Sequence, residues 1–318
     1  MECVLCKNGS VDLLCEINVV NLCNVYRRII MQDIANEFNG MNSIKYVKCP
    51  NCDLRFFSPV VTGSYKFYDL LSQKMGVNYY QYEKNEYKFA GSFINENDSV
   101  LDVGSGCGTF KKYVKGQYVG LDFNPSAIEQ AKKEKIRVIN ESVENHVFNI
   151  SSLYSVVTAF QVLEHMADPR KFLQACLDVL TPGGLLIISV PSEESFVALQ
   201  ENAVLNMPPH HVSRWTDRSL YSLENIFDIT LVCMEHDILE KIHVETYLSL
   251  LANITIRTLL KWNKVEMVDV SLKKRIVDKL SSYLKPLYRN VFNSSLLWPK
   301  GHSVTVIYKK HKSSQDYC

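Results

Sequence analysis

The sequence predicts an α/β protein with helices on both faces of a mainly parallel, seven-stranded sheet. Residues 99–122 read as a strand, a glycine-rich turn, a helix and a second strand. Further short apolar runs follow at 137–140, 155–160 and 185–191, separated by segments with helical spacing of apolar residues. Short apolar strands that alternate with helices are typical of a sheet covered on both faces.

The turn between the first two strands is suited to a nucleoside ligand. Gly104, Gly106 and Gly108 leave this turn without side chains, so that a ligand can contact the backbone. Asp122 follows Asp102 by 20 residues and ends the next strand. A carboxylate at that position can accept hydrogen bonds from both ribose hydroxyls of an adenosine.

The details of the turn favour a cationic ligand over a diphosphate. The dinucleotide pattern G-x-G-x-x-G requires a glycine where this chain has Thr109. The negative charge of Asp102 would repel a diphosphate and attract an ammonium or sulfonium group. We therefore expect S-adenosylmethionine (SAM), with its carboxylate near the helix N-terminus. An oxidoreductase with an unusual dinucleotide turn is the alternative among enzymes.

The motifs that follow the turn resemble those of class I SAM-dependent methyltransferases. Asn124 and Pro125 open a helix, QVLEHMADP (161–169) follows the fourth strand, and TPGG (181–184) precedes the fifth. The resemblance implies a Rossmann-like sheet whose last strand, GHSVTVIYKK (301–310), is inserted antiparallel. It also implies that a tyrosine, Tyr79 or Tyr80, closes over the methionine end of SAM, and that further cofactor contacts come from Ser105, Phe123, Ser142 and Gln161.

Methyl transfer to a hydroxyl also needs a group that removes a proton. Glu164 and His165 follow the fourth strand, and His210 and His211 follow the fifth, so both pairs belong to one edge of the sheet. We predict that the base is among these four residues, with Arg214 of the second loop as a further candidate. The alternative is that a histidine only holds its loop by hydrogen bonds. Some quinone-type relatives hold a metal with an acid three residues before the Glu-His pair. Gln161 stands there, which argues against a catalytic metal.

Two cysteine pairs near the N-terminus predict a structural zinc site. Cys3-x-x-Cys6 and Cys49-x-x-Cys52 have the spacing of zinc knuckles, and four thiolates complete a tetrahedral site with no open position. The 42 residues between the pairs form an unusually long connection. Many sugar-modifying and natural-product methyltransferases carry a similar N-terminal zinc module. Two other cysteines of this region remain competing ligands: Cys15 and Cys23.

Composition and charge argue against several other classes. The chain has 318 residues, of which 47% are hydrophobic, and a formal net charge of +1, which gives no global attraction to nucleic acid. Residues 1–60 hold six basic and six acidic side chains, so the zinc module does not resemble a nucleic-acid reader. The sequence shows neither an apolar span nor a signal peptide, and we expect a cytoplasmic protein.

A long insertion before the last strand has helical spacing and a positive charge. Residues 257–289 contain nine Lys or Arg and three Asp or Glu. This pattern is consistent with a solvated helix face, with binding of an acidic substrate, or with peripheral contact of residues 255–290 with an anionic membrane.

We expect four parts: a zinc-binding module (1–64), an aromatic linker and capping helix (65–98), a methyltransferase domain (99–235 plus 300–312) and a helical basic insertion (236–299). The expected function is O- or C-methylation of a sugar or glycan precursor, including a lipid-linked one. The alternatives are methylation of a quinone-like or aromatic natural product, and a zinc-ribbon binding or regulatory protein with a non-catalytic nucleotide fold. The oligomeric state stays open.

Overall fold

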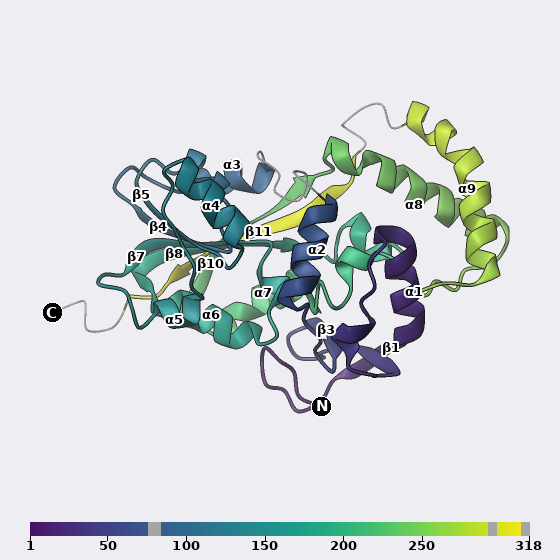
Figure 1. The fold of residues 1–318 in the computed structure, drawn as a ribbon, viewed down its shortest axis with the longest axis horizontal. Helices are drawn as coiled ribbons and strands as arrows, with labels where there is room; N and C mark the ends of the chain where they lie inside the picture. Colours follow the sequence, from purple (N-terminus) through teal and green to yellow (C-terminus); the bar gives the residue numbers. More distant parts are fainter. Residues whose placement is uncertain (76–83, 292–297, 313–318) are drawn as a thin grey trace.

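The structure, a computed structural model, describes residues 1–75, 84–291 and 298–312. Its centre is a seven-stranded sheet with the order β10-β11-β8-β7-β4-β5-β6 (Figure 1). β4 pairs in parallel with β5 and β7, whereas β11 is antiparallel to both of its neighbours. The predicted α/β sheet with an inserted antiparallel last strand is therefore confirmed. The strands are β4 (Ser99–Val103), β5 (Gln117–Leu121), β6 (Val138–Ile139), β7 (Tyr154–Phe160), β8 (Leu180–Pro191), β10 (Ile229–Ile238) and β11 (Lys300–Lys310).

Both faces of the sheet are buried, because successive apolar residues of its central strands enter two different clusters. Leu101 and Val157 belong to the cluster that includes α6, whereas Val100 and Val156 belong to the cluster that includes α3. The helices of this domain are α3 (Asn85–Gly91), α4 (Pro125–Lys133), α5 (Val143–His146), α6 (Pro169–Asp178) and α7 (Asp217–Tyr221). Short 3₁₀ turns complete it: η3 (Thr109–Tyr113), η4 (Leu163–His165), η5 (Phe196–Leu199), η6 (Val204–Asn206) and η7 (Ser222–Asn225).

Two local expectations differ from the structure. The helix expected after the glycine turn is the short 3₁₀ turn η3. The TPGG turn lies inside β8, because Leu180 already pairs with Tyr154 of β7. Gly184 permits this approach, since a Cβ atom there would lie 2.7 Å from the backbone oxygen of Ser155.

The N-terminal region forms a second sheet with the order β1-β2-β3-β9. Its first three strands come from the predicted zinc module, but β9 (Ser213–Arg214) belongs to the loop after β8. Phe56 of β3 pairs with Ser213, so this sheet joins the N-terminal region to the methyltransferase domain. The remaining elements here are β1 (Asp12–Asn18), α1 (Val19–Ile30), η1 (Ala35–Phe38), β2 (Ser43–Lys48), β3 (Arg55–Ser58) and α2 (Tyr65–Met75).

The insertion between β10 and β11 is helical, as expected. It forms α8 (Lys241–Leu259) and α9 (Leu272–Val291), which pack against each other at one end of the molecule (Figure 1). Among the helices of the described ranges, none has the length and apolar character that crossing a membrane requires.

Candidate functional site

The glycine turn after β4 has a backbone that other residues would strain. Gly104, Gly106 and Gly108 have φ angles of 71°, 55° and 79°, which lie in the left-handed region. A Cβ atom on Gly104 would lie 2.4 Å from Val162, a residue of the loop after β7. The turn is therefore in close contact with the loop that carries Glu164 and His165.

Asp122, at the end of β5, reaches back across this turn. One carboxylate oxygen accepts a hydrogen bond from the backbone N–H of Gly106 (2.7 Å), and the other accepts one from Asn124 (2.7 Å). Burial raises the pKa of this carboxyl above its usual value. The hydroxyl of Ser105 faces the sheet, since a Cβ atom on Gly120 would lie 2.4 Å from it.

Asp102 lies inside the sheet rather than at the open mouth of the turn. Its side chain is buried and accepts hydrogen bonds from the hydroxyls of Tyr118 (2.7 Å) and Thr158 (2.8 Å). Burial raises its pKa to about 7. Because each oxygen already accepts one hydrogen bond, a contact between Asp102 and the ammonium of SAM stays a prediction.

Three other predicted cofactor residues have contrasting surroundings. Phe123 is 62% exposed directly after Asp122, where its ring is free to cover a ligand. The hydroxyl of Ser142 accepts a hydrogen bond from the backbone of Asn145 and caps α5. The predicted tyrosines, Tyr79 and Tyr80, lie outside the described residues.

Gln161 holds a buried polar network between β7, β8 and β11. Its φ angle of 57° turns the chain at the end of β7. Its amide nitrogen lies 2.9, 3.2 and 3.0 Å from side-chain oxygens of Glu86, Ser189 and Ser303, which share its two hydrogens. The role of Gln161 in cofactor binding stays a prediction. Sequence reasoning missed the three partners, because they are distant in the chain and share no motif.

The four predicted base candidates meet in one buried cluster. The imidazole centroids of His165, His210 and His211 lie 4.5 to 4.8 Å from one another. The backbone N–H of Val212 donates to the carbonyl of Glu164 (2.9 Å), which holds the two loops together. The two polar loops therefore converge at one edge of the sheet, as the sequence predicts.

Each imidazole is oriented by a hydrogen bond at its Nδ1 atom. Nδ1 of His165 lies 2.6 Å from the carbonyl of His210, and Nδ1 of His210 lies 2.8 Å from the carbonyl of Leu205. Nδ1 of His211 lies 3.2 Å from Oδ1 of Asn206. The hydroxyl of Tyr68, on α2, lies 3.2 Å from Nδ1 of His165. The sequence offered no signal for Tyr68, which comes from the N-terminal region.

Burial keeps this cluster uncharged near neutral pH. It raises the pKa of Glu164 to about 8 and lowers the pKa values of His165 and His210 to about 4 and 3. Burial also places the pKa of His211 well below its usual value. Both carboxylate oxygens of Glu164 are buried without a hydrogen-bond partner.

Arg214, the further base candidate in the loop after β8, makes structural contacts. Arg214 is buried, and its guanidinium lies 3.3 Å from the carboxylate of Glu193 and over the ring of Tyr46. These contacts connect Arg214 of β9 with Tyr46 of β2 and with the segment after β8, and its role as a base stays a prediction.

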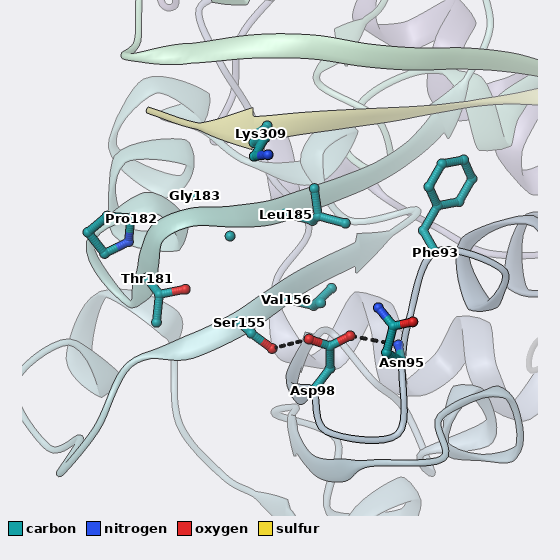
Figure 2. A pocket seen from close by; sticks show the side chains of 11 residues that line it. Phe93, Asn95, Asp98, Ser155, Val156, Thr181, Pro182, Gly183, Leu185 and Lys309 are labelled. Carbon is teal, nitrogen blue, oxygen red and sulfur yellow. Dashed lines mark hydrogen bonds between the residues drawn. The ribbon is translucent and has the colours of Figure 1, made fainter. Parts of the chain in front are cut away.

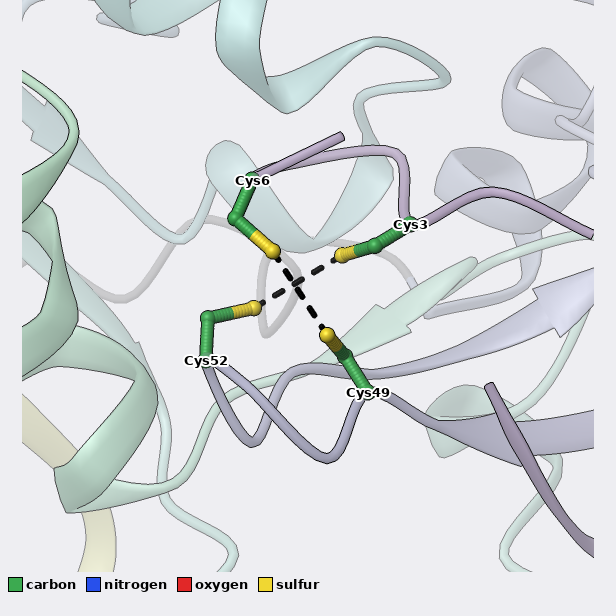
Figure 3. A group of neighbouring side chains, drawn as sticks. All are labelled: Cys3, Cys6, Cys49 and Cys52. Atoms are coloured by element: carbon green, nitrogen blue, oxygen red, sulfur yellow. Dashed lines mark hydrogen bonds between the residues drawn. The ribbon is translucent and has the colours of Figure 1, made fainter. Parts of the chain in front are cut away.

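The four cysteines of the two predicted knuckles also meet (Figure 3). The Sγ atoms of Cys3 and Cys52 are 3.6 Å apart, and those of Cys6 and Cys49 are 3.5 Å apart. Four thiolates around zinc, with bonds of about 2.3 Å, are about 3.8 Å from one another. The cluster therefore fits a tetrahedral zinc ion. The two competing cysteines lie outside this cluster: Cys15 and Cys23.

The two knuckles have matching backbone hydrogen bonds. The carbonyls of Cys3 and Cys49 accept from the N–H groups of Lys7 and Asp53, which both have left-handed φ angles. This repeated geometry points each pair of thiols toward the other pair, which suits one shared ion.

A pocket of about 320 Å³ lies away from this chemistry (Figure 2). It is lined by Asp98, directly before β4, and by Ser155, near the start of β7. The hydroxyl of Ser155 donates to Asp98 (2.8 Å). Because these residues precede the strands, the pocket lies at the amino edge of the sheet, opposite the glycine turn, and is not the predicted cofactor site.

Comparison with known proteins identifies the domain. Residues 78–232 match a protein family described as "Methyltransferase domain". The ubiquinone biosynthesis O-methyltransferase of Proteus mirabilis is 29% identical over 123 residues, which cover 35% of this chain and 50% of that protein. The enzyme of the same name from Yersinia pestis (strain Pestoides F) is 33% identical over 99 residues, covering 28% and 41%. The chain thus spans half or less of the length of these relatives.

Two solved structures have a similar arrangement of elements. A SAM-dependent methyltransferase from Archaeoglobus fulgidus is 18% identical, with a TM-score of 0.47 and coverage of 77% of this chain and 100% of that chain. The plantazolicin methyltransferase BamL is 11% identical, with a TM-score of 0.48 and coverage of 92% and 96%. The predicted class I methyltransferase domain is confirmed by the family match together with the observed strand order.

Proposed function

We propose that this protein, on the methyltransferase domain that it carries, transfers the methyl group of SAM to a hydroxyl oxygen of a small molecule. The observation that carries the proposal is the position of the Glu164 cluster beside the glycine turn. Val162, two residues before Glu164, packs directly against Gly104. A cofactor on the turn and an acceptor at the cluster would therefore be neighbours.

Two groups of residues would have different roles in such a reaction, one binding the cofactor and the other the acceptor. SAM, when bound, supplies a methyl group that is already activated on a sulfonium. The glycine turn and Asp122 hold the nucleoside, and the cluster orients the acceptor and takes its proton. The two carboxyl oxygens of Glu164 lack a hydrogen-bond partner within the described residues, and the raised pKa makes this group, once ionised, a stronger base toward an acceptor hydroxyl.

Two acceptor classes have separate support. The relatives named for ubiquinone biosynthesis are O-methyltransferases, which favours an aromatic or quinone-like hydroxyl acceptor. The four-cysteine module supports a sugar or glycan precursor, because it resembles the module of sugar-modifying methyltransferases. We place the aromatic acceptor first, since the relatives match the methyltransferase part of the chain.

A screen of methyl transfer tests both classes. Labelled SAM is offered with phenols and catechols, with nucleotide sugars and with glycans, and the methylated product is identified. Glu164→Gln should lower the rate by about 10²- to 10⁴-fold, the range of general base catalysis, without loss of S-adenosylhomocysteine binding. The matched control, Glu134→Gln, changes an exposed glutamate at the C-terminal end of α4. An unchanged rate in Glu164→Gln would contradict the assignment.

We also propose that Cys3, Cys6, Cys49 and Cys52 bind a structural zinc ion. Elemental analysis of the purified protein should show about one equivalent less zinc in Cys49→Ser than in the wild type. Cys23→Ser, which changes a buried cysteine outside the cluster, is the control. Equal zinc contents in all three proteins would contradict the site.

We further propose peripheral contact of the insertion with an anionic membrane, in keeping with the cytoplasmic location that we predict. One side of α9 exposes apolar residues at helical spacing, namely Leu272, Ile276, Leu280, Tyr283 and Leu287. Arg275 and Lys279 are exposed on the same helix. An apolar stripe next to cations is the pattern of a helix that lies in a lipid interface.

A further inference from the structure

The three histidines surround one common space, and Glu164 lies beside it, next to His165 and His211. One ring nitrogen from each of His165, His210 and His211 lies within 4.8 Å of the others. Oε1 of Glu164 lies 3.8 Å from Nε2 of both His165 and His211, which is too far for a hydrogen bond. The four side chains are thus close to one another but are not bonded to one another.

The atoms that face this space lack hydrogen-bond partners. Within the described residues, both oxygens of Glu164 and Nε2 of His210 are buried and unpaired. Unpaired buried polar atoms are costly, and they are rare in proteins unless an ion or a water occupies the site. A water has only two hydrogens to donate, whereas a cation satisfies all the lone pairs around it.

The outer contacts of the histidines are those of metal ligands. Nδ1 of His165 and of His210 each lies within hydrogen-bond distance of a backbone carbonyl, so each must donate its proton there. The lone pair is then on Nε2. A histidine that binds a metal characteristically donates its other ring N–H to a carbonyl or carboxylate in this way.

The orientation of the Asn206 side-chain amide decides which ring nitrogen of His211 carries the proton. In the orientation described above, its Oδ1 accepts from Nδ1 of His211 and leaves the lone pair on Nε2. The reverse orientation instead offers the amide oxygen to Arg214 and the amide nitrogen to His211. The reverse orientation satisfies both Arg214 and His211, so an ion bound by His211 must select the first orientation against the hydrogen bonds from Arg214.

We propose that His165, His210 and His211 bind one divalent transition-metal ion, separate from the four-cysteine zinc site. Ligand atoms bonded at about 2.1 Å to a tetrahedral ion are about 3.4 Å apart, so the three ring nitrogens, which lie within 4.8 Å of one another, must move closer together around the ion, and the fourth position stays open. Three imidazoles suit zinc, iron or cobalt and not magnesium. Ion binding does not depend on the proposed function. The use of the ion in catalysis does rest on the proposed function, because an ion here would orient an acceptor oxygen beside the glycine turn.

This donor set differs from the one considered in the sequence. The acid expected at position 161 in metal-binding relatives is absent, and Gln161 is instead engaged with Glu86, Ser189 and Ser303. The ligands would come from His210 and His211, in a loop about 45 residues further along the chain. The fold brings this loop to Glu164 through the hydrogen bond from Val212.

Cobalt loading of the full-length protein tests the proposal without SAM or acceptor. The protein is freed of metal with a chelator, titrated with Co²⁺, and followed by visible absorption and by ion counting. Wild type should bind about one Co²⁺ more than His210→Gln, and this extra ion should show ligand-field bands without thiolate charge-transfer absorption. His146→Gln, which changes a buried histidine bonded to Glu141 and Tyr154, should behave as wild type.

Equal Co²⁺ binding by wild type and His210→Gln would overturn the proposal. Should His210→Gln fail to fold by circular dichroism, the wild-type spectrum decides alone, because cobalt seen only on thiolates contradicts the site. Calorimetry with S-adenosylhomocysteine, run separately, tests the proposed function. A negative result in the cobalt titration does not contradict the proposed function, and a negative result in calorimetry does not contradict the metal site.

Discussion

Asp122 is the side chain that would connect the glycine turn to a ribose. Its oxygens each accept one backbone hydrogen bond, from Gly106 and Asn124, and each keeps a further lone pair for a ligand hydroxyl. These bonds hold the carboxylate at the turn before any ligand arrives. Its contribution to binding can therefore be measured with little reorganisation of the protein.

Replacing Asp122 by Ala should weaken S-adenosylhomocysteine binding by at least about 10- to 150-fold, the effect of one lost bond. The reason is the loss of hydrogen bonds to a charged acceptor, each of which contributes about 1.5 to 3 kcal/mol. Calorimetry gives the dissociation constants, and Asp228→Ala, at an exposed side chain far from the turn, is the control. An unchanged constant in Asp122→Ala would place the ribose elsewhere.

The raised pKa of Asp102 should make the free energy of unfolding depend on pH. Burial raises the pKa of Asp102 from its usual 3.8 to about 7 in the folded state, so the folded protein keeps a proton that the unfolded chain releases near pH 4. The free energy of unfolding should then fall as the pH rises from about 4 to about 7, by up to about 1.4 kcal/mol per pH unit. Asp102→Asn, which cannot titrate, should lack this part of the slope.

Urea denaturation of the ligand-free proteins at several pH values measures the difference. Other buried acids contribute to the slope of both proteins, so the comparison of wild type with Asp102→Asn isolates the one carboxyl. Parallel pH profiles would mean that Asp102 is ionised in the folded protein, held by the hydroxyls of Tyr118 and Thr158.

At the scale of single elements, ion pairs of α8 and α9 limit how much of the positive charge of the insertion is available to bind an anionic surface. Arg257 and Lys274 are buried in ion pairs with Glu201, and Lys285 and Arg289 pair with Glu245. The excess of basic residues that the sequence shows is therefore partly neutralised within the fold. A membrane contact must depend on the apolar stripe as much as on charge.

Leu287→Asp should lower binding to liposomes that contain anionic lipid by about tenfold or more, because it replaces an exposed apolar side chain of the stripe by a charge. Ser282→Asp adds the same charge at an exposed polar position of the same helix and should have a smaller effect. Flotation at low salt measures the bound fraction. Failure of the wild type to float with these liposomes would exclude the membrane contact.

The elements that could be predicted are those with strong local patterns. The central strands, the knuckles and the two histidine loops follow from apolar runs, cysteine spacing and the rule that parallel strands end at one edge. β9 has only two residues and is formed by pairing with β3, so no local pattern announces it. The partners Tyr68 and Asn206 were equally hidden, because their roles depend on tertiary contacts.

At the scale of the whole molecule, the N-terminal region and the histidine loop are parts of one hydrogen-bonded structure. Phe57 of β3 donates its backbone N–H to the carbonyl of Val212 (3.0 Å), and Val212 donates to the carbonyl of Glu164 (2.9 Å). The predicted boundary of the zinc module at residue 64 stays a prediction. Across it, the strand that follows the second knuckle supports the cluster directly.

Disruption of the cysteine cluster should therefore loosen the histidine loop. In Cys49→Ser, loss of the bound ion should weaken β3, which begins three residues after Cys52. The amide hydrogens of residues 207–216 should then exchange faster than in the wild type. Exchange followed by mass spectrometry measures this segment, with Cys23→Ser as the control. If Cys49→Ser loses zinc while residues 207–216 keep wild-type protection, the module stabilises itself alone, and the bonds from Phe57 to Glu164 transmit nothing to the site.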